Sequence, residues 1–278
     1  MNEKEQAEEI RRIAKAGDPD RYAAALFAPT DVRPHLLALH ALNVELSRIA
    51  ELVTEPQLGE IRLQWWRDAL ASAAAGETTG HPVADAVGRA VLERNLPRAP
   101  LDALVDARRF DVSVKIMPDM TALEEYLVGT AGALFQLSAA VLGRADNAPH
   151  AAARAAGLAY GLTGLMRALP VHTRRGRIDL PGDLLCTHGV SQPRVLAGER
   201  SEALTEVLAA LRERAGKELA EASRQIAGLP PRSQLAFLPL ALVAPYLACL
   251  EKADPFGDIV ALNPLYRLWR FNIWRAGG

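Results

Sequence analysis

The chain has 278 residues, of which 50% are hydrophobic, 23% charged and 5% aromatic. Its 32 basic and 33 acidic residues give a formal net charge of −1, so no chain-wide basic field exists to hold a nucleic acid, and nucleic-acid binding is not expected. The two cysteines, Cys186 and Cys249, are too few for a disulfide framework and are predicted to be buried thiols. The charged first residues resemble neither a secretory signal nor a transit peptide, which favours a cytoplasmic location.

The hydrophobic pattern predicts helices from the first residues onward and almost no strands. Asn2 and Glu5 have the spacing of a capping box, and Gly17 can close the helix that they open. A second helix is expected after Asp18. Pro34 stands in the first turn of a third helix, where a missing N–H does no harm.

Further helices are predicted at about 58–75, 81–94, 101–112, 123–142, 150–169, 202–226, 230–251 and 264–275. No linker rich in Pro, Ser or Gly and no internal repeat divides the chain. The apolar run 235–250 contains Pro239 and Pro245 and is shorter than the roughly 20 residues of a membrane span. We therefore expect one all-α domain of about ten helices covering residues 1–278.

Two helical segments combine polar or aromatic residues with apolar neighbours. On the helix at 38–51, Glu45, Arg48 and Glu51 fit either a solvated face with an Arg48–Glu45 ion pair or part of a site. The adjacent Trp65 and Trp66 fit either a core wedge or one wall of an apolar cavity. Sequence alone favours the structural interpretation of both segments.

The segment 157–181 is unusual because its predicted helix contains several glycines. Gly157, Gly161 and Gly164 each weaken a helix interior by up to about 1 kcal/mol relative to alanine, so they indicate a close approach of another helix or of a ligand. The basic stretch after Pro170 fits either a phosphate-binding loop or an exposed turn, and the spacing does not decide between them.

Several common site types find no support in the sequence. The six histidines include no H-E-x-x-H pattern and no paired-cysteine spacing, so a zinc site is not expected. The chain has no G-x-S-x-G elbow, no P-loop and no G-x-G-x-x-G. Hydrolase, nucleotide-binding and dinucleotide-binding interpretations therefore lack a motif.

Taken in order over about 20–274, several segments resemble the squalene/phytoene synthase family. The matching pieces are RPHLLALHAL at 33–42, LQWWR at 63–67, LEEY at 123–126, AG at 131–132 and the stretch 157–181, which ends in GRIDLP. The resemblance implies an all-α, single-domain isoprenoid (prenyl/terpenoid) synthase-like helical bundle around a central cavity. Members join two isoprenoid diphosphates head to head, using magnesium held by two Asp-rich motifs.

The chain departs from the family pattern where those acidic motifs should stand. Ser47, Arg48 and Glu51 occupy the acid positions of the first motif, and Ala168, Val171 and His172 those of the second. Only one carboxylate is left of the six positions, too few for a magnesium cluster that neutralises a departing diphosphate. We expect no catalytic residue, no metal ligand and no cofactor, with magnesium needed only if the chain is an enzyme after all.

These departures resemble a branch of the family that includes an assembly factor of mitochondrial respiratory complex I. The segments that carry this resemblance are NVEL at 43–46, LGEIRLQWWR at 58–67, LMRALPVH at 165–172, HGVSQ at 188–192 and PLYRLWRFNIW at 264–274. The resemblance implies a non-catalytic assembly factor or chaperone for respiratory complex I. The alternatives are a head-to-head prenyltransferase and a passive carrier of an isoprenoid or another lipid.

The resemblance also implies which residues surround the cavity. Glu51, Tyr126, Arg167 and Arg177 would surround the diphosphates in the prenyltransferase alternative. The full set of pocket candidates is Ser47, Arg48, Glu51, Trp66, Tyr126, Thr163, Arg167, His172 and Arg177.

The last predicted helix is a candidate surface for a protein of a membrane respiratory complex or for peripheral contact with the inner membrane. This helix mixes apolar and basic side chains, a composition that suits an interface or a membrane boundary. The apolar residues are Leu268, Trp269, Phe271, Ile273 and Trp274, and the basic ones are Arg267, Arg270 and Arg275. Equally, this helix could pack its apolar side on the domain and leave its arginines in water.

Overall fold

The computed structural model describes residues 2–113, 116–143 and 149–276, and every regular element within these ranges is helical. The elements are α1 (Glu3–Gly17), α2 (Pro19–Ala25), α3 (Arg33–Leu52), α4 (Pro56–Ala74), α5 (Pro82–Arg94), α6 (Arg98–Ala107), α7 (Arg109–Val112), α8 (Met120–Leu127), the π-helical turn η1 (Val128–Gly132), α9 (Ala133–Leu142), α10 (His150–Arg174), α11 (Gly182–Thr187), α12 (Gln192–Leu196), α13 (Glu202–Ala227), α14 (Pro231–Gln234), the 3₁₀ helix η3 (Leu235–Leu242), α15 (Val243–Leu250) and α16 (Pro264–Ala276).

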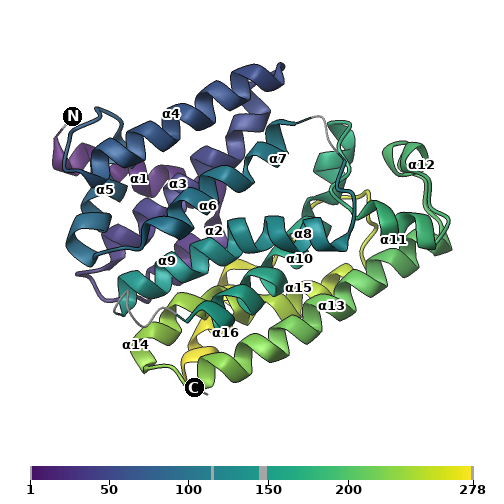
Figure 1. The fold of residues 1–278 in the computed structure, drawn as a ribbon. Coiled ribbons are helices and arrows are strands. Elements are labelled where there is room, and N and C mark those ends of the chain that lie inside the picture. Colours follow the sequence, from purple (N-terminus) through teal and green to yellow (C-terminus); the bar gives the residue numbers. More distant parts are fainter. Residues whose placement is uncertain (1, 114–115, 144–148, 277–278) are drawn as a thin grey trace.

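The long helix α10 is central to the bundle (Figure 1), where it packs along α13 and, on another side, against η1 and α9. One hydrophobic cluster joins α1, α3, α5, α6 and α9 to the first half of α10. A second joins the rest of α10 to α8 and α13. Because α10 contributes buried residues to both clusters, it aligns the two halves of the bundle.

The first three helices begin as the sequence predicts. Asn2 and Glu5 form the expected capping box, and the Asp18 side chain accepts a hydrogen bond from the backbone N–H of Arg21 at the start of α2. Pro34 lies in the first turn of α3.

Helix α10 runs past the point where the sequence predicted its end. It was expected to stop at Leu169, but it continues through Pro170 to Arg174. Proline in a helix interior costs about 3 kcal/mol, because it removes one hydrogen bond and crowds the preceding turn. Here Pro170 and Thr173 are both buried, and the Thr173 hydroxyl donates to the Leu169 carbonyl at 2.9 Å. Burial of this last turn outweighs the proline penalty.

Three other predicted helices are interrupted. The segment predicted at 101–112 divides at Arg108 into α6 and α7, and that at 123–142 contains the π-helical turn η1. The segment predicted at 230–251 becomes α14, η3 and α15, because Pro239 and Pro245 lack the N–H groups that a continuous α-helix needs. The short helices α11 and α12 were not predicted.

Two helical stretches, Met120–Leu142 and Pro231–Leu250, are long and apolar enough to cross a membrane by length and composition. The second extends beyond the 235–250 run that the sequence considered. The apolar window of the first is 67% buried and that of the second 50% buried inside the fold. Their apolar residues therefore supply much of the core.

The prediction of two buried thiols is wrong. Cys186 on α11 and Cys249 on α15 are both exposed. Cys186 follows the buried Leu185, whereas Cys249 follows the exposed Ala248, and both side chains lie on the solvent side of their short helices.

Candidate functional site

A cavity of about 210 Å³ opens between α10 and the helices that face it. Side chains from α2, α3, α8, η1 and α10, together with Arg108 at the break between α6 and α7, form its walls. The lining residues are Arg21, Asn43, Arg108, Tyr126, Leu127, Thr130, Ala131, Tyr160, Gly161, Gly164, Leu165, Ala168, His172 and Asp179. For an all-α bundle of mostly apolar helices this wall is rich in charged and hydroxyl groups.

Arg108 is the centre of a buried hydrogen-bond network in this wall. Its Nη1 donates to Asp111 Oδ2 at 2.9 Å and to the Tyr126 hydroxyl at 3.1 Å, and its Nη2 donates to Asn43 Oδ1 at 2.9 Å. The Tyr126 hydroxyl donates in turn to Asp111 Oδ1 at 2.8 Å. Three separate helical segments are thus tied together by one guanidinium.

The network continues toward the end of α10 through Arg177. Its Nη1 donates to the Asp111 carbonyl at 2.7 Å, and its Nη2 donates to Asp179 Oδ1 at 3.0 Å. The other carboxylate oxygen of Asp179 lies 2.6 Å from Nδ1 of His172. Asp179 is therefore held from both sides by cationic or hydrogen-bonding partners.

At the other end of the cavity, Arg21 is buried. It forms an ion pair with Asp18 at 2.8 Å, and its guanidinium carbon lies 4.2 Å from the centre of the Tyr160 ring. Within the described part of the chain, Arg21 Nη2 and Arg108 Nε are buried without a hydrogen-bond partner. Both nitrogens are buried within the packed wall, which therefore contains donors that the described residues do not satisfy.

Burial and pairing fix the charges of the network. Burial alone would raise the pKa of Asp179, but the hydrogen bond from His172 and the charge of Arg177 outweigh it and lower the pKa. Burial chiefly raises the pKa of Tyr126, and Asp111 adds to that rise. At neutral pH the cavity therefore presents a neutral phenol and a carboxylate whose charge is matched by its neighbours.

The three glycines of α10 differ in how closely their neighbours pack against them. A Cβ on Gly157 would lie 2.5 Å from the backbone of Gly132, so α10 crosses the π-helical turn at a contact that only glycine permits. A Cβ on Gly161 would meet Leu127 at 2.7 Å, whereas one on Gly164 would meet nothing within 4 Å. The close-approach interpretation holds for Gly157 and Gly161, while Gly164 borders the cavity.

Of the nine pocket candidates from the sequence, Tyr126 and His172 line the cavity, and Arg177 joins the network beside it. The candidates on α3 contact other residues and do not line the cavity. The Ser47 hydroxyl donates to the Val44 carbonyl, and Glu51 pairs with Arg175.

Arg48 lies on a solvated helix face beside Glu45, as the structural interpretation of this segment predicted. Its guanidinium lies 3.9 Å from Glu45, and about half of the side chain is exposed. It forms no other ion pair among the residues described.

The structure places Thr163, Arg167 and Trp66 away from the cavity. The Thr163 hydroxyl is buried and donates to the Ala159 carbonyl at 2.7 Å. Arg167 is not among the lining residues, and its guanidinium lies over the Tyr246 ring at 3.7 Å and pairs with Asp20. Trp66 is a core residue, as the spacing favoured.

The sequence missed most of the network. Asn43 and Asp179 stand inside segments that carried the family resemblance, so their polar character was available as a signal. Arg21, Arg108 and Asp111 lie in ordinary helical sequence and become site residues only through packing.

The carboxylates at this site do not fit magnesium, the metal that the family resemblance implies. Glu51 is paired with Arg175, and Asp179 with Arg177 and His172. In the described ranges, no three His, Cys, Asp or Glu side chains are grouped so that they could hold a metal ion. Magnesium prefers several oxygens with their charge uncompensated, and here each acidic group faces a cation instead.

Fold and cavity together define an all-α protein of the isoprenoid-synthase type. The family model for squalene/phytoene synthase matches residues 14–267, and the chain belongs to that family.

Three relatives illustrate its similarities. Complex I assembly factor 6 of NADH dehydrogenase (ubiquinone) from Mus musculus is 31% identical over 243 residues, covering 87% of this chain and 73% of that one. A phytoene synthase from Arthrospira platensis is 29% identical over 234 residues, covering 76% of this chain and 74% of that one. A dehydrosqualene synthase crystal structure superposes with a TM-score of 0.84 at 18% identity, covering 99% of this chain and 96% of that one, which supports the fold alone.

Proposed function

We propose that this chain is a non-catalytic member of its family that assists the assembly of respiratory complex I. The observation that carries the proposal is that five of the family's six acid positions hold no acid. The sixth, Glu51, is paired with Arg175, and His172 is paired with Asp179. The similarity to complex I assembly factor 6 supports the same conclusion.

The chemistry of diphosphate departure explains why the exchange matters. The departing diphosphate carries several negative charges that must be neutralised as the carbon–oxygen bond breaks, and metal ions on free carboxylates do this in water-excluded sites. In this chain Glu51 and Asp179 face arginines and a histidine. Binding a metal ion there would first require breaking those pairs.

The cavity also supports a role without turnover. At about 210 Å³ it is smaller than the roughly 300–1,000 Å³ of typical small-molecule pockets, and Arg108 and Arg177 cross-link its walls. Under this proposal the fold is kept as a scaffold. Its partner is a protein of a membrane respiratory complex, its location is cytoplasmic at the inner membrane, and it needs neither a cofactor nor nucleic acid.

Deleting the gene in its native host tests the proposal. Assembled complex I on native gels and NADH oxidation by isolated membranes should both fall several-fold, and a plasmid copy should restore them. Unchanged levels of assembled complex in the deletion strain would overturn the assembly role.

The prenyltransferase alternative rests on the phytoene synthase similarity. It requires magnesium and release of pyrophosphate from isoprenoid diphosphates. The carrier alternative rests on the cavity and requires an isoprenoid or other lipid to copurify with the chain, which native mass spectrometry would detect.

A further inference from the structure

Helix α16 attaches to the bundle through one face that contains two of its arginines. Arg267 forms an ion pair with the buried Asp20 at 2.8 Å, and Arg270 Nε donates to the Ala241 carbonyl at 3.1 Å. Phe271, the residue after Arg270, is fully buried and meets the Phe27 ring edge-on, with centroids 5.7 Å apart. The expectation of an apolar inner face with all its arginines in water is therefore wrong.

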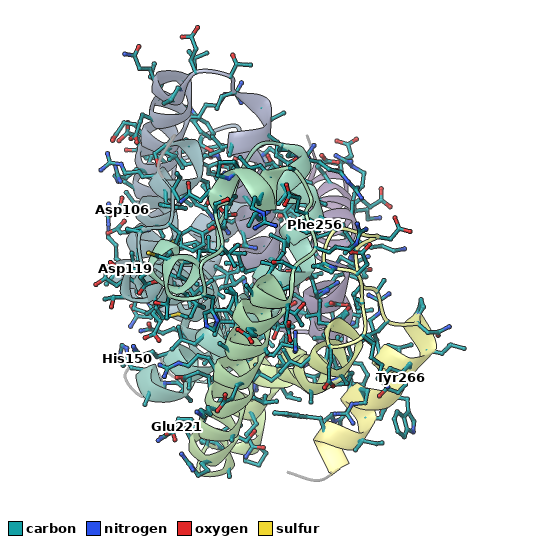
Figure 2. All side chains as sticks on the ribbon, turned by 90° about the vertical axis from the view of Figure 1, so that its right-hand side faces the viewer. Asp106, Asp119, His150, Glu221, Phe256 and Tyr266 are labelled. Carbon is teal, nitrogen blue, oxygen red and sulfur yellow. The ribbon has the colours of Figure 1, made fainter. Side chains whose placement is uncertain are left out.

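The opposite face of α16 is apolar and exposed. Leu265 is 75% exposed and Trp269 53%, and Tyr266, Leu268 and Ile273 are each exposed by more than a third. The rings of Tyr266 and Trp269 pack against each other at 5.5 Å, and Figure 2 shows Tyr266 projecting from the helix away from the rest of the chain. An exposed apolar patch of this kind is typical of a surface that binds a membrane or another protein.

The charge of this region is of one sign. From Ile259 to the end of the sequence there are three arginines and no acidic residue. Arg267 is neutralised by Asp20, but Arg270 and Arg275 make no ion pair within the ranges that the structure describes. Arg270 donates to the bundle, whereas Arg275 is exposed and is the cation of α16 that has no carboxylate partner among the described residues.

We propose that the outer face of α16 binds the surface of an anionic lipid bilayer. Leucine and isoleucine side chains would enter the boundary of the acyl chains, while tryptophan and tyrosine rings are the groups that membrane proteins place at headgroup depth. The exposed Arg275 would contact lipid phosphates. This inference rests on the proposed location at the inner membrane and names the surface that would bind there, but vesicle binding can hold or fail separately from the assembly role.

Helix α4 carries a second exposed apolar stripe, and it differs from the outer face of α16 in the charge of the surrounding residues. Leu58 and Ile61 are 47% and 65% exposed, so apolar exposure there is comparable. However, α4 and its N-cap carry three acids, Glu55, Glu60 and Asp68, against two arginines, so this stripe has no excess of positive charge for an anionic surface to attract. The α4 stripe therefore provides a matched control.

Flotation of the purified full-length chain with vesicles tests the proposal. We expect the chain to float with vesicles of phosphatidylcholine and phosphatidylglycerol and to stay in the dense fraction with phosphatidylcholine alone. The triple variant Leu265→Ser, Trp269→Ser, Ile273→Ser should lower the bound fraction at least tenfold. The control Leu58→Ser, Ile61→Ser should bind as the unchanged chain does, and circular dichroism melting checks that both variants are folded.

The charge component has its own pair of variants. Arg275→Glu should weaken binding to the anionic vesicles several-fold, whereas Arg62→Glu on α4 should not. Failure of the chain to float, or equal flotation of the triple variant and the control, would overturn the proposal. A dimer in sedimentation experiments that the triple variant abolishes, without vesicle binding, would assign the face to a second copy and equally overturn it.

Discussion

The imidazole Nδ1 of His172 lies 2.6 Å from a carboxylate oxygen of Asp179, at the mouth of the cavity. His172 occupies an acid position of the second family motif, and Asp179 lies seven residues further along the chain in the GRIDLP segment. Arg177 holds the other oxygen of the same carboxylate. The replacement of the acid is thus accommodated by a partner, and the local charge is balanced within the chain.

Restoring the acid should therefore damage the fold. His172→Asp would place two carboxylates against each other in a partly buried site, and we expect a loss of about 1–3 kcal/mol in the free energy of unfolding. Adding Asp179→Asn should recover most of it, because only one charge then remains. Urea denaturation at pH 7 measures both effects. Equal or higher stability of the single variant, especially with added magnesium, would contradict this account.

Arg108 should be the most sensitive residue of the network. Arg108→Met leaves the buried Asp111 with only the more distant Arg177, 3.6 Å away, as a cationic partner, and removing one partner of a buried pair costs about 3–5 kcal/mol. The double variant Arg108→Met, Asp111→Leu should lose less than the single one, since no unpaired charge remains. Arg98→Met is the control, because its pair with Asp102 is exposed and should contribute less than about 1 kcal/mol. A loss as small as that of the control would remove Arg108 from the centre of the site.

Stability should fall on mild acidification because of His40. Burial, reinforced by the charge of Arg21, lowers the pKa of His40 from about 6.5 to about 4. Between these values the unfolded chain binds a proton that the folded chain does not, so stability is lost as the pH falls from 6.5 toward 4. The loss from this ring is about 2 kcal/mol between pH 6.5 and pH 5, at 1.4 kcal/mol per unit.

The variant His40→Leu checks this sign. Its free energy of unfolding should depend less on pH over that interval, although His35 and His81, whose pKa values burial also lowers, act in the same direction. Denaturation curves at pH 7, 6 and 5 measure the slope. Equal slopes for the two chains would show that the pKa of His40 is the same in the folded and unfolded chains, which would contradict this account.

Replacing two glycines of α10 by alanine should change the free energy of unfolding in opposite directions. Gly157→Ala would push a methyl group to 2.5 Å from the backbone of Gly132, and overpacking of this kind costs about 2–3 kcal/mol. Gly164→Ala meets nothing within 4 Å and should stabilise the helix by about 0.5–1 kcal/mol. Thermal unfolding of both variants measures the difference. Similar effects of both substitutions would contradict the close contact at Gly157.

Local signals predicted most of the helices but not the site. The capping box at Asn2 and Glu5 and the apolar period of α3 are properties of neighbouring residues, so the sequence contains them. The contacts of Arg108 with Asn43, 65 residues away, depend on how three helices pack. Such a contact leaves no periodic pattern, and it also depends on the break between α6 and α7 that was not predicted.

The same limit explains the errors at Pro170 and on α16. Local rules predict that a helix ends before proline. Helix α10 continues through Pro170 because the turn that follows is buried. Composition identified α16 as amphipathic without telling which residues face the bundle. Asp20, more than 240 residues earlier, decides that question by pairing with Arg267.

Pyrophosphate release tests most directly the claim that this cavity has exchanged its metal ligands for an internally paired network. The purified chain is incubated with farnesyl diphosphate, with and without magnesium, and free pyrophosphate is measured. The account predicts release at the rate of the protein-free blank under both conditions. Release that requires magnesium and that Glu51→Ala abolishes would contradict it and identify the chain as an enzyme.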